Sequence, residues 1–277
     1  MWYKLKRIMM RPNGVEKQVR PPRQFNWDLS KAIASNRTSF TVSAYSYEVK
    51  LSADGTKMFI GWNNPNHPGS PDGAIVQYTL TTPFDITTAT DRIDYGVWIL
   101  RDYPNPCFAD NWMKLFVWKG NNTTYARYDL TTAYDLSTVD FSNPDATFSM
   151  TSDLAIQSVS ADGKSFIYRP WSSRNLSYAV SSTAREPLNS QTNLISSSNV
   201  VSWTFCNEWK MLMFMDGTTI KKYEFWTPYD LTTLNTTPIQ TQSTGLSWNP
   251  WGIYVDIYWD NIYFAIGNTT VYRYNLV

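Results

Sequence analysis

Short stretches in which hydrophobic and polar residues alternate recur along the chain, and each is interrupted by a polar turn. Residues 49–62 and 157–171 read VKLSADGTKMFIGW and QSVSADGKSFIYRPW. A hydrophobic period of two indicates β-strands, and the pairs Asp54-Gly55 and Asp162-Gly163 are strong signals for tight hairpins. Related patterns at 107–120, 204–217 and 255–267 predict three further hairpins.

A second element follows each hairpin and begins with a tyrosine. It reads YTLTTPFDITT at 78–88, YDLTTAYDLST at 128–138 and YEFWTPYDLTT at 223–233. A degenerate copy begins at Tyr178 and a truncated copy at Tyr274. These tyrosines are 50, 50, 45 and 51 residues apart. One repeat therefore predicts four strands. A tight turn joins the first two, a variable loop leads to the third, and the Thr-Pro-Asp loop leads to the fourth. Repeats of four antiparallel strands are typical of a β-propeller.

The sequence thus predicts an all-β fold, a five-bladed β-propeller with four-stranded blades of about 50 residues; a sandwich or an open β-array is the alternative. The last repeat contains only three strands. Residues 27–30, WDLS, match the internal loops, and SFTVS at 39–43 stands where a fourth strand should follow. We expect residues 36–43 to complete the blade that begins at Ile253, which closes the ring without a covalent link and hides the sheet edges.

The repeated aspartates have a structural interpretation. Asp28, Asp85, Asp135 and Asp230 recur once per repeat, and an aspartate in such a loop accepts hydrogen bonds from backbone N–H groups two residues further on. An active site would instead need different residues from different blades. We therefore predict that these four carboxylates cap turns.

Residues 1–24 lie outside the repeat and form a basic N-terminal arm, whereas residues 25–277 form the propeller. The arm has seven basic residues and one acidic residue, and the rest of the chain has 17 basic and 22 acidic residues, so the arm is +6 and the remainder −5. Residues 11–14, RPNG, favour a turn between two short strands. Such a hairpin is marginal alone, so we expect the arm to bind a partner or, alternatively, its own propeller. The expected contact residues are Trp2, Tyr3, Lys4, Leu5, Lys6, Arg7, Ile8, Arg11, Lys17 and Arg20.

Composition excludes several classes of protein. The net charge is +1 and only 17% of the residues are charged, which argues against a nucleic-acid binder. No apolar run approaches the roughly 18 residues of a membrane span, and no hydrophobic stretch follows the basic N-terminus as in a secretory signal. Two cysteines, Cys107 and Cys206, do not make a disulfide framework, so we expect free thiols.

Residues for enzyme chemistry are sparse. The single histidine, His67, lies in a predicted loop, and neither a metal-ligand spacing nor a nucleotide-binding glycine motif occurs. We therefore predict no catalytic residue, no metal and no cofactor. Five-bladed propellers include glycoside hydrolases that use paired carboxylates, so this activity is an alternative. Its candidate carboxylates sit on or beside the hairpin turns: Asp54, Asp110, Asp162, Glu208 and Asp256.

Four tryptophans fall near predicted strand ends or loops: Trp62, Trp118, Trp171 and Trp226. At the surface, such rings could stack on sugars or pack against a protein neighbour. Packing between blades is the alternative for each of them. They are our candidates for surface or glycan-binding aromatics.

The repeat resembles repeats in β-propellers predicted in tailed-bacteriophage virions. The resemblance rests on 78–88, 128–138 and 223–233 together with 52–60 and 160–167, and it covers about residues 26–277. The third copy departs from it, because Ser182-Thr183-Ala184-Arg185 replaces Thr-Pro-Tyr-Asp. The resemblance implies a virion structural or attachment protein and supplies no catalytic residue.

We therefore expect a non-enzymatic virion component of the tail, collar or head, made in the host cytoplasm and present in multiple copies. Its arm would bind neighbouring virion proteins. The alternatives are a glycan-binding module for host attachment and a glycoside hydrolase of the five-bladed propeller type. We expect neither a nucleic-acid partner nor membrane insertion.

Overall fold

A computed structural model describes most of the repeat region. The described residues are 28–42, 45–63, 73–100, 104–109, 113–118, 124–149, 154–159, 165–170, 176–180, 192–195, 200–206, 211–227, 231–256, 260–267 and 269–276. The predicted arm at residues 1–24 lies outside them, as do His67 and Trp171.

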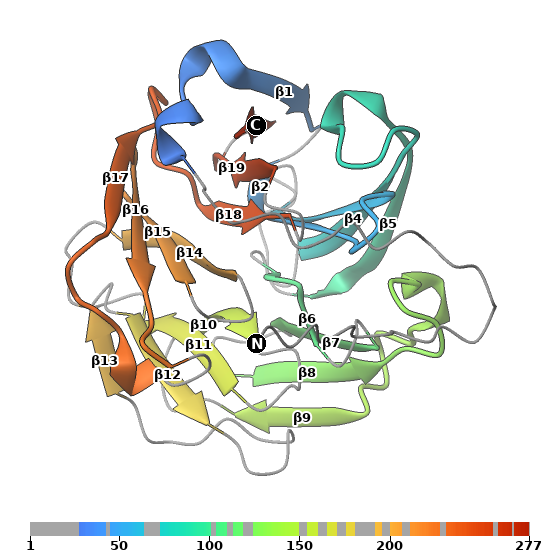
Figure 1. Ribbon diagram of the computed structural model, residues 1–277. Coiled ribbons are helices and arrows are strands. Elements are labelled where there is room, and N and C mark those ends of the chain that lie inside the picture. Colours follow the sequence, from blue (N-terminus) through green and yellow to red (C-terminus); the bar gives the residue numbers. More distant parts are fainter. Residues whose placement is uncertain are drawn as a thin grey trace, which may run out of the picture.

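The described strands form five four-stranded antiparallel sheets set around a central axis (Figure 1). The innermost strands of neighbouring sheets contact one another around this axis, β6 with β10, β10 with β14, β14 with β18 and β18 with β2. The all-β propeller arrangement predicted from the repeat is confirmed.

Each sheet follows chain order from its inner to its outer strand. The first sheet contains β2 (Tyr45–Leu51), β3 (Lys57–Asn63), β4 (Gly73–Leu80) and β5 (Ala89–Leu100). The second contains β6 (Cys107–Ala109), β7 (Lys114–Trp118), β8 (Thr124–Asp129) and β9 (Ala146–Ser149). The third contains β10 (Leu154–Val159), β11 (Ser165–Pro170), β12 (Leu176–Val180) and β13 (Thr192–Ile195).

The fourth sheet contains β14 (Val200–Cys206), β15 (Met211–Asp216), β16 (Thr219–Glu224) and β17 (Gln240–Ser243). The fifth contains β18 (Gly252–Val255), β19 (Asn261–Ala265), β20 (Thr270–Asn275) and β1 (Arg37–Thr41). Short 3₁₀ helices lie outside the sheets: η1 (Leu29–Lys31), η2 (Ala34–Asn36), η3 (Ile86–Thr88), η4 (Leu136–Thr138) and η5 (Leu231–Thr233).

The fifth sheet joins the two ends of the chain. Strand β1 pairs antiparallel with β20, from Arg37 opposite Tyr274 to Thr41 opposite Thr270. The Arg37 guanidinium lies 4.6 Å from the centre of the Tyr272 ring. The predicted closing strand is thus confirmed, because the strand occupies 37–41 within the expected 36–43.

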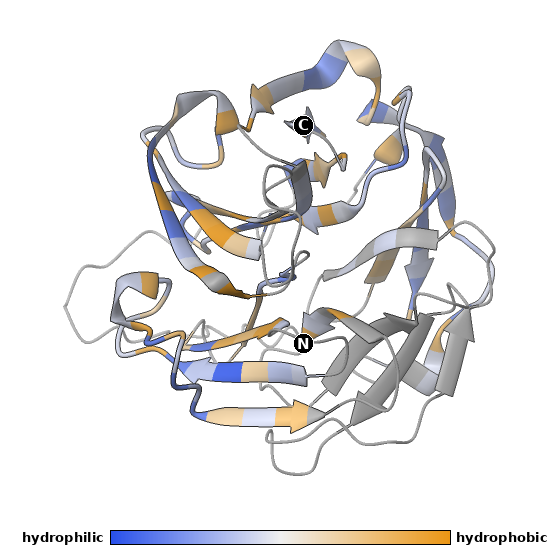
Figure 2. Ribbon diagram, turned by 180° about the vertical axis from the view of Figure 1, so that it is seen from behind, coloured by the Kyte–Doolittle hydropathy of each residue, from blue (hydrophilic) through white to orange (hydrophobic). Residues whose placement is uncertain are grey.

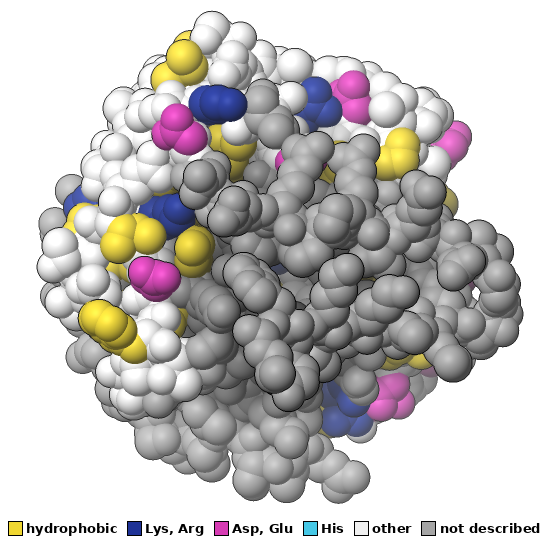
Figure 3. Space-filling view, viewed as in Figure 1, with side chains coloured by type: hydrophobic (Ala, Val, Ile, Leu, Met, Phe, Trp, Pro, Cys, Tyr) yellow, Lys and Arg dark blue, Asp and Glu magenta, His cyan; other side chains and the backbone are white. Residues whose placement is uncertain are grey.

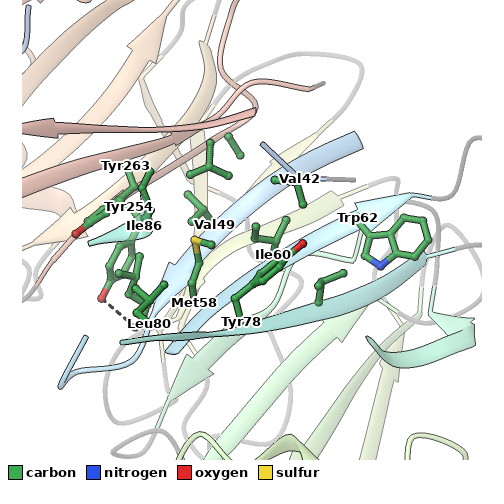
Figure 4. Packing of buried hydrophobic residues seen from close by; sticks show 14 of the residues in the cluster. Val42, Val49, Met58, Ile60, Trp62, Tyr78, Leu80, Ile86, Tyr254 and Tyr263 are labelled. Carbon is green, nitrogen blue, oxygen red and sulfur yellow. Dashed lines mark hydrogen bonds between the residues drawn. The ribbon is translucent and has the colours of Figure 1, made fainter. Parts of the chain in front are cut away.

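Hydrophobic side chains fill the spaces between neighbouring sheets. Figure 4 shows the cluster between the first and fifth sheets, where Met58, Ile60 and Tyr78 face Tyr254 and Tyr263. Middle strands are covered on both faces, so every residue of β19 is buried, as expected for a sheet that is packed on both sides. Outer strands are more exposed, as the burial patterns of β1 and β17 show, and both hydrophilic and hydrophobic positions occur along β5 in Figure 2.

Candidate functional site

The repeated aspartates cap turns at three of the four predicted positions. Oδ1 of Asp85 accepts from the backbone N–H and the hydroxyl of Thr87 at 3.1 and 2.7 Å. Asp28 and Asp135 make the same backbone bond to Ser30 and Ser137. The side-chain hydrogen bond from the neighbouring serine is the main cause that lowers the pKa of both Asp28 and Asp135. The capping prediction is confirmed there, and Asp230 lies outside the described residues.

Phe84 and Tyr134, which directly precede Asp85 and Asp135, tie their loops to the preceding sheet. The Phe84 carbonyl accepts hydrogen bonds from the Tyr263 hydroxyl at 2.8 Å and from the Arg273 guanidinium at 2.9 Å. The carbonyl of Tyr134, in the next copy, accepts from Lys57 Nζ at 3.2 Å. Both aromatics have positive φ angles, 64° and 62°, a conformation that is uncommon for bulky residues. In both copies the repeated motif thus links its loop to the neighbouring sheet, and we call this set of contacts a latch.

Two of the five carboxylates proposed for a hydrolase are used by turns. Asp54 Oδ1 accepts from the hydroxyls of Ser52 and Thr56 at 2.7 and 2.8 Å. The two carboxylate oxygens of Asp256 accept from the Asp260 N–H at 3.1 Å and from the Asn261 amide at 2.7 Å. Asp110, Asp162 and Glu208 lie outside the described residues.

Two of the four candidate tryptophans are not surface residues. Trp62 is 7% exposed and Trp118 is fully buried. The Arg92 guanidinium lies 5.5 Å from the Trp62 ring centre, and Trp118 stacks on Tyr125 at 5.8 Å. The expectation of exposed rings is therefore wrong for both, because a strand between two neighbouring sheets buries its end as well as its middle.

Trp226 is 83% exposed, as expected for a surface aromatic. It follows β16, where its N–H donates to the Thr233 carbonyl at 3.2 Å. The sequence analysis missed two other exposed tryptophans, Trp248 at 69% and Trp251 at 37%. A signal was available, because both flank an Asn-Pro pair, which favours a loop. On the face in Figure 3, hydrophobic side chains form separate patches, with Lys or Arg close to Asp or Glu.

A buried ion pair lies close to the axis, where the first, second and fifth sheets meet. Lys50 Nζ is 2.7 Å from Glu48 Oε1, and both side chains are at least nine-tenths buried. Burial raises the pKa of Glu48 to about 7, although Lys50 opposes the shift. Burial also raises the pKa of the free thiol of Cys107, on the innermost strand of the second sheet, to about 12. Such a thiol stays protonated and unreactive near neutral pH.

Further buried polar groups lie just before β6 and on the inner strand β14. The Asn105 amide donates to the Ile156 carbonyl at 2.8 Å and thus links the second and third sheets. Ser202 on β14 is fully buried. Within the described ranges, no group of three or more His, Cys, Asp or Glu residues is placed to hold a metal ion. Among the helices that the structure describes, none is long and apolar enough to cross a membrane.

No family model and no curated protein sequence matches the chain. Among solved structures, the chain is similar to the β-propeller domain of Cps50 (Swd1) from Myceliophteria thermophila, with a TM-score of 0.44 and 9% identity over 82% of this chain. The match spans 64% of that structure's chain. A structure of the Mitotic Checkpoint Complex matches with a TM-score of 0.46 and 12% identity, over 85% of this chain and 78% of the other. At these levels of similarity neither structure bears on function.

Proposed function

We propose that each four-stranded sheet is one blade of a five-bladed propeller, and that this propeller is a non-enzymatic structural component of a tailed-phage virion. The N-terminal arm would hold it to a neighbouring virion protein in the tail, the collar or a head decoration, in multiple copies. The support is the repeat resemblance, the charge contrast between arm and propeller, and the way in which the residues that follow the arm, from Asp28 onward, are held.

The firm hold on the first described residues, from Asp28 onward, is the observation that carries the proposal. Asp28 is exposed, whereas Leu29 and Ala32 directly after it are fully buried. Oδ1 of Asp28 accepts from the Gln240 amide at 3.1 Å, so Asp28 lies beside β17. The described chain therefore begins at a fixed point on the surface, and the proposed arm would be tethered there. A partner that binds the arm gains a firm connection to the propeller through β1.

Exposed apolar side chains near Asp28 support a protein-contact surface at this place. Ile239, directly before Gln240, is 46% exposed, and Ile33 is 41% exposed. Large apolar side chains at the surface favour protein–protein contact over bulk solvent. Together with Trp2, Tyr3, Leu5 and Ile8 of the arm, they would extend the buried area at the anchor.

The test is a deletion of residues 2–20, which leaves the capping Asp28 and the closing strand in place. We expect the truncated protein to keep its melting temperature and to lose incorporation into particles assembled with it. A chain with Lys4, Lys6, Arg7 and Arg11 changed to glutamine is the matched control for charge. It should bind more weakly, because the attraction to an acidic partner is removed. Normal copy number for the deletion would contradict the anchoring role.

The hydrolase alternative receives less support, since Asp54 and Asp256 are held by turns. It predicts cleavage of a host polysaccharide by the purified protein, lost in one Asp-to-Ala or Glu-to-Ala variant. Release of reducing ends from the polysaccharide is the measurement that separates it from the structural proposal.

A further inference from the structure

The connection between the fourth and fifth sheets presents tryptophan in surroundings that lack charge. From Leu231 to Val255 the chain contains no Asp, Glu, Lys, Arg or His. Within this segment Trp248 is 69% exposed, and its neighbours Ser247 and Asn249 are exposed too. The loop tip therefore combines an open indole with a hydroxyl and a carboxamide.

This loop is held firmly on both sides of its tip. The N–H and the hydroxyl of Thr244 both donate to the Thr218 carbonyl, at 3.1 and 2.8 Å. Leu246 is buried in the core cluster of the fourth and fifth sheets. On the other side, the Trp251 N–H donates to the Ala265 carbonyl at 2.7 Å. A tip fixed in this way loses little conformational entropy when it binds a ligand.

The second indole of the loop is fixed in place. Tyr47 contacts the Trp251 ring edge to face, with centroids 5.6 Å apart. A Cβ atom at Gly267 would lie 2.3 Å from this indole, so only glycine leaves room for it there. Trp251 thus forms a rigid base for the tip, and Trp248 provides the open ring.

The charged groups next to the loop neutralise one another. Asn249 lies beside the turn at Gly217, and the adjacent Asp216 is paired with Lys221 at 2.6 Å. Glu48, which follows Tyr47, is paired with Lys50. Among the described residues packed against the loop, charge does not favour an acidic or a basic ligand.

We propose that the loop tip, residues 247–251, binds an uncharged sugar ring of a glycan. The polarised C–H groups on one face of a pyranose would pack on the electron-rich face of the Trp248 indole. Its hydroxyls would exchange hydrogen bonds with the Asn249 carboxamide and the Ser247 hydroxyl, which both donate and accept. A neutral sugar needs no charged partner, whereas an acidic sugar or a basic peptide does. This site is independent of the arm and of the proposed place in a virion.

Trp226 offers a matched control. It is exposed, but it lies at the other end of the fourth sheet, since Lys222 pairs with Gln240 and Thr219 pairs with Ser243. The full-length protein is titrated with neutral oligosaccharides of glucose, galactose, mannose and N-acetylglucosamine. Binding is followed by calorimetry and by the NMR signal of the Trp248 indole N–H, which the variant W248F identifies.

We expect at least one of these probes to bind and to shift the Trp248 signal. W248A should weaken binding by about tenfold or more, as is common for a central aromatic contact. N249A should weaken it less, and W226A or deletion of residues 2–20 should leave it unchanged. High salt should have little effect on a neutral ligand.

Three results would overturn the proposal: no shift of the Trp248 signal by any probe at millimolar concentration, equal losses in W226A and W248A, or binding confined to charged oligosaccharides. Capture of a virion protein that W248A abolishes, without any sugar binding, would show a protein-docking loop instead. If the arm deletion is not incorporated into particles but still binds sugar, the sugar-binding site is unaffected by that result. The two proposals can therefore fail separately.

Discussion

The first sheet has two neighbours, and its two boundaries are built differently. Towards the second sheet the chain is continuous, and Tyr134 bonds the first sheet twice: its carbonyl accepts from Lys57 Nζ and its hydroxyl accepts from the Ala53 N–H. Towards the fifth sheet the chain is also continuous, from β1 to β2, but that sheet contains the non-covalent pairing of β1 with β20. There the Phe84 carbonyl accepts two hydrogen bonds, and Arg273 also forms an ion pair with Asp85 at 3.1 Å. The boundary with the fifth sheet therefore has more polar contacts of this kind, and we call it the closing boundary because that sheet closes the ring.

Both boundaries contain a glycine at a point where the backbones on the two sides come close together. A Cβ atom at Gly61 would lie 1.8 Å from the Pro104 carbonyl oxygen of the second sheet, and one at Gly252 would lie 2.7 Å from the Glu48 Cα atom. Glycine thus permits close backbone contact on each side of the first sheet. The boundary with the fifth sheet differs in its polar side chains, since Arg273 connects β20, one partner in the non-covalent closure, to the first sheet.

The largest effect should come from removing the closing strand. Deletion of residues 1–44 removes β1 and the buried Leu29, a side chain whose burial alone contributes about 1.5–3 kcal/mol. It also leaves the hydrogen-bonding edge of β20 open, which favours aggregation. Size-exclusion chromatography and a thermal melt are the measurements, and deletion of residues 2–20 is the control. A soluble product with an unchanged melting temperature would contradict this account of closure.

The Glu48–Lys50 pair should be the next most sensitive feature. Changing one member leaves a buried group unpaired, so Glu48→Gln or Lys50→Met should reduce the free energy of unfolding by about 3–5 kcal/mol. The double variant E48Q/K50M should lose much less, because no buried charge remains. Urea denaturation of all three variants gives the coupling energy. Additive losses would show that the two side chains do not interact.

The two latches can be compared directly. Arg273→Met removes a charged hydrogen bond and an ion pair, and should cost about 1.5–3 kcal/mol. Lys57→Met removes one hydrogen bond at the boundary with the second sheet, leaves the one between the Ala53 N–H and the Tyr134 hydroxyl, and should cost less. The exposed Lys31→Met serves as a control with no expected change. If R273M and K57M have equal effects on the urea midpoint, the closing boundary is not the more strongly latched one.

A more gradual effect should be a dependence of stability on pH. The pKa of Glu48 is raised from 4.5 to about 7 by burial, so the folded state binds the proton more tightly than the unfolded state. The tighter binding of this proton stabilises the folded state fully below about pH 4.5, and the contribution is lost as the pH rises through 7. Asp28 and Asp135, with lowered pKa values, act only at lower pH. Unfolding measured from pH 5 to 8 should show this decline in the native chain and not in E48Q/K50M.

Local patterns in the sequence determined the repeat, the four strands of each copy, the capping aspartates and the closing strand. Each depends on residues close together in the chain: alternation predicts a strand, and Asp with a serine or threonine two residues later predicts a capped turn. Even the closing strand followed from a local match, because Asp28-Leu29-Ser30 repeats the internal loops.

Tertiary structure decided which aromatic and charged side chains are buried. Trp62, Trp118 and Trp226 all stand near strand ends or in loops, yet the first two lie between sheets and the third is exposed. Nothing local distinguishes them, since the neighbouring sheet that covers a ring comes from a distant part of the chain. The same holds for Glu48 and Lys50, which look like exposed alternating residues in the sequence. They are buried because inner strands of three sheets converge at the axis.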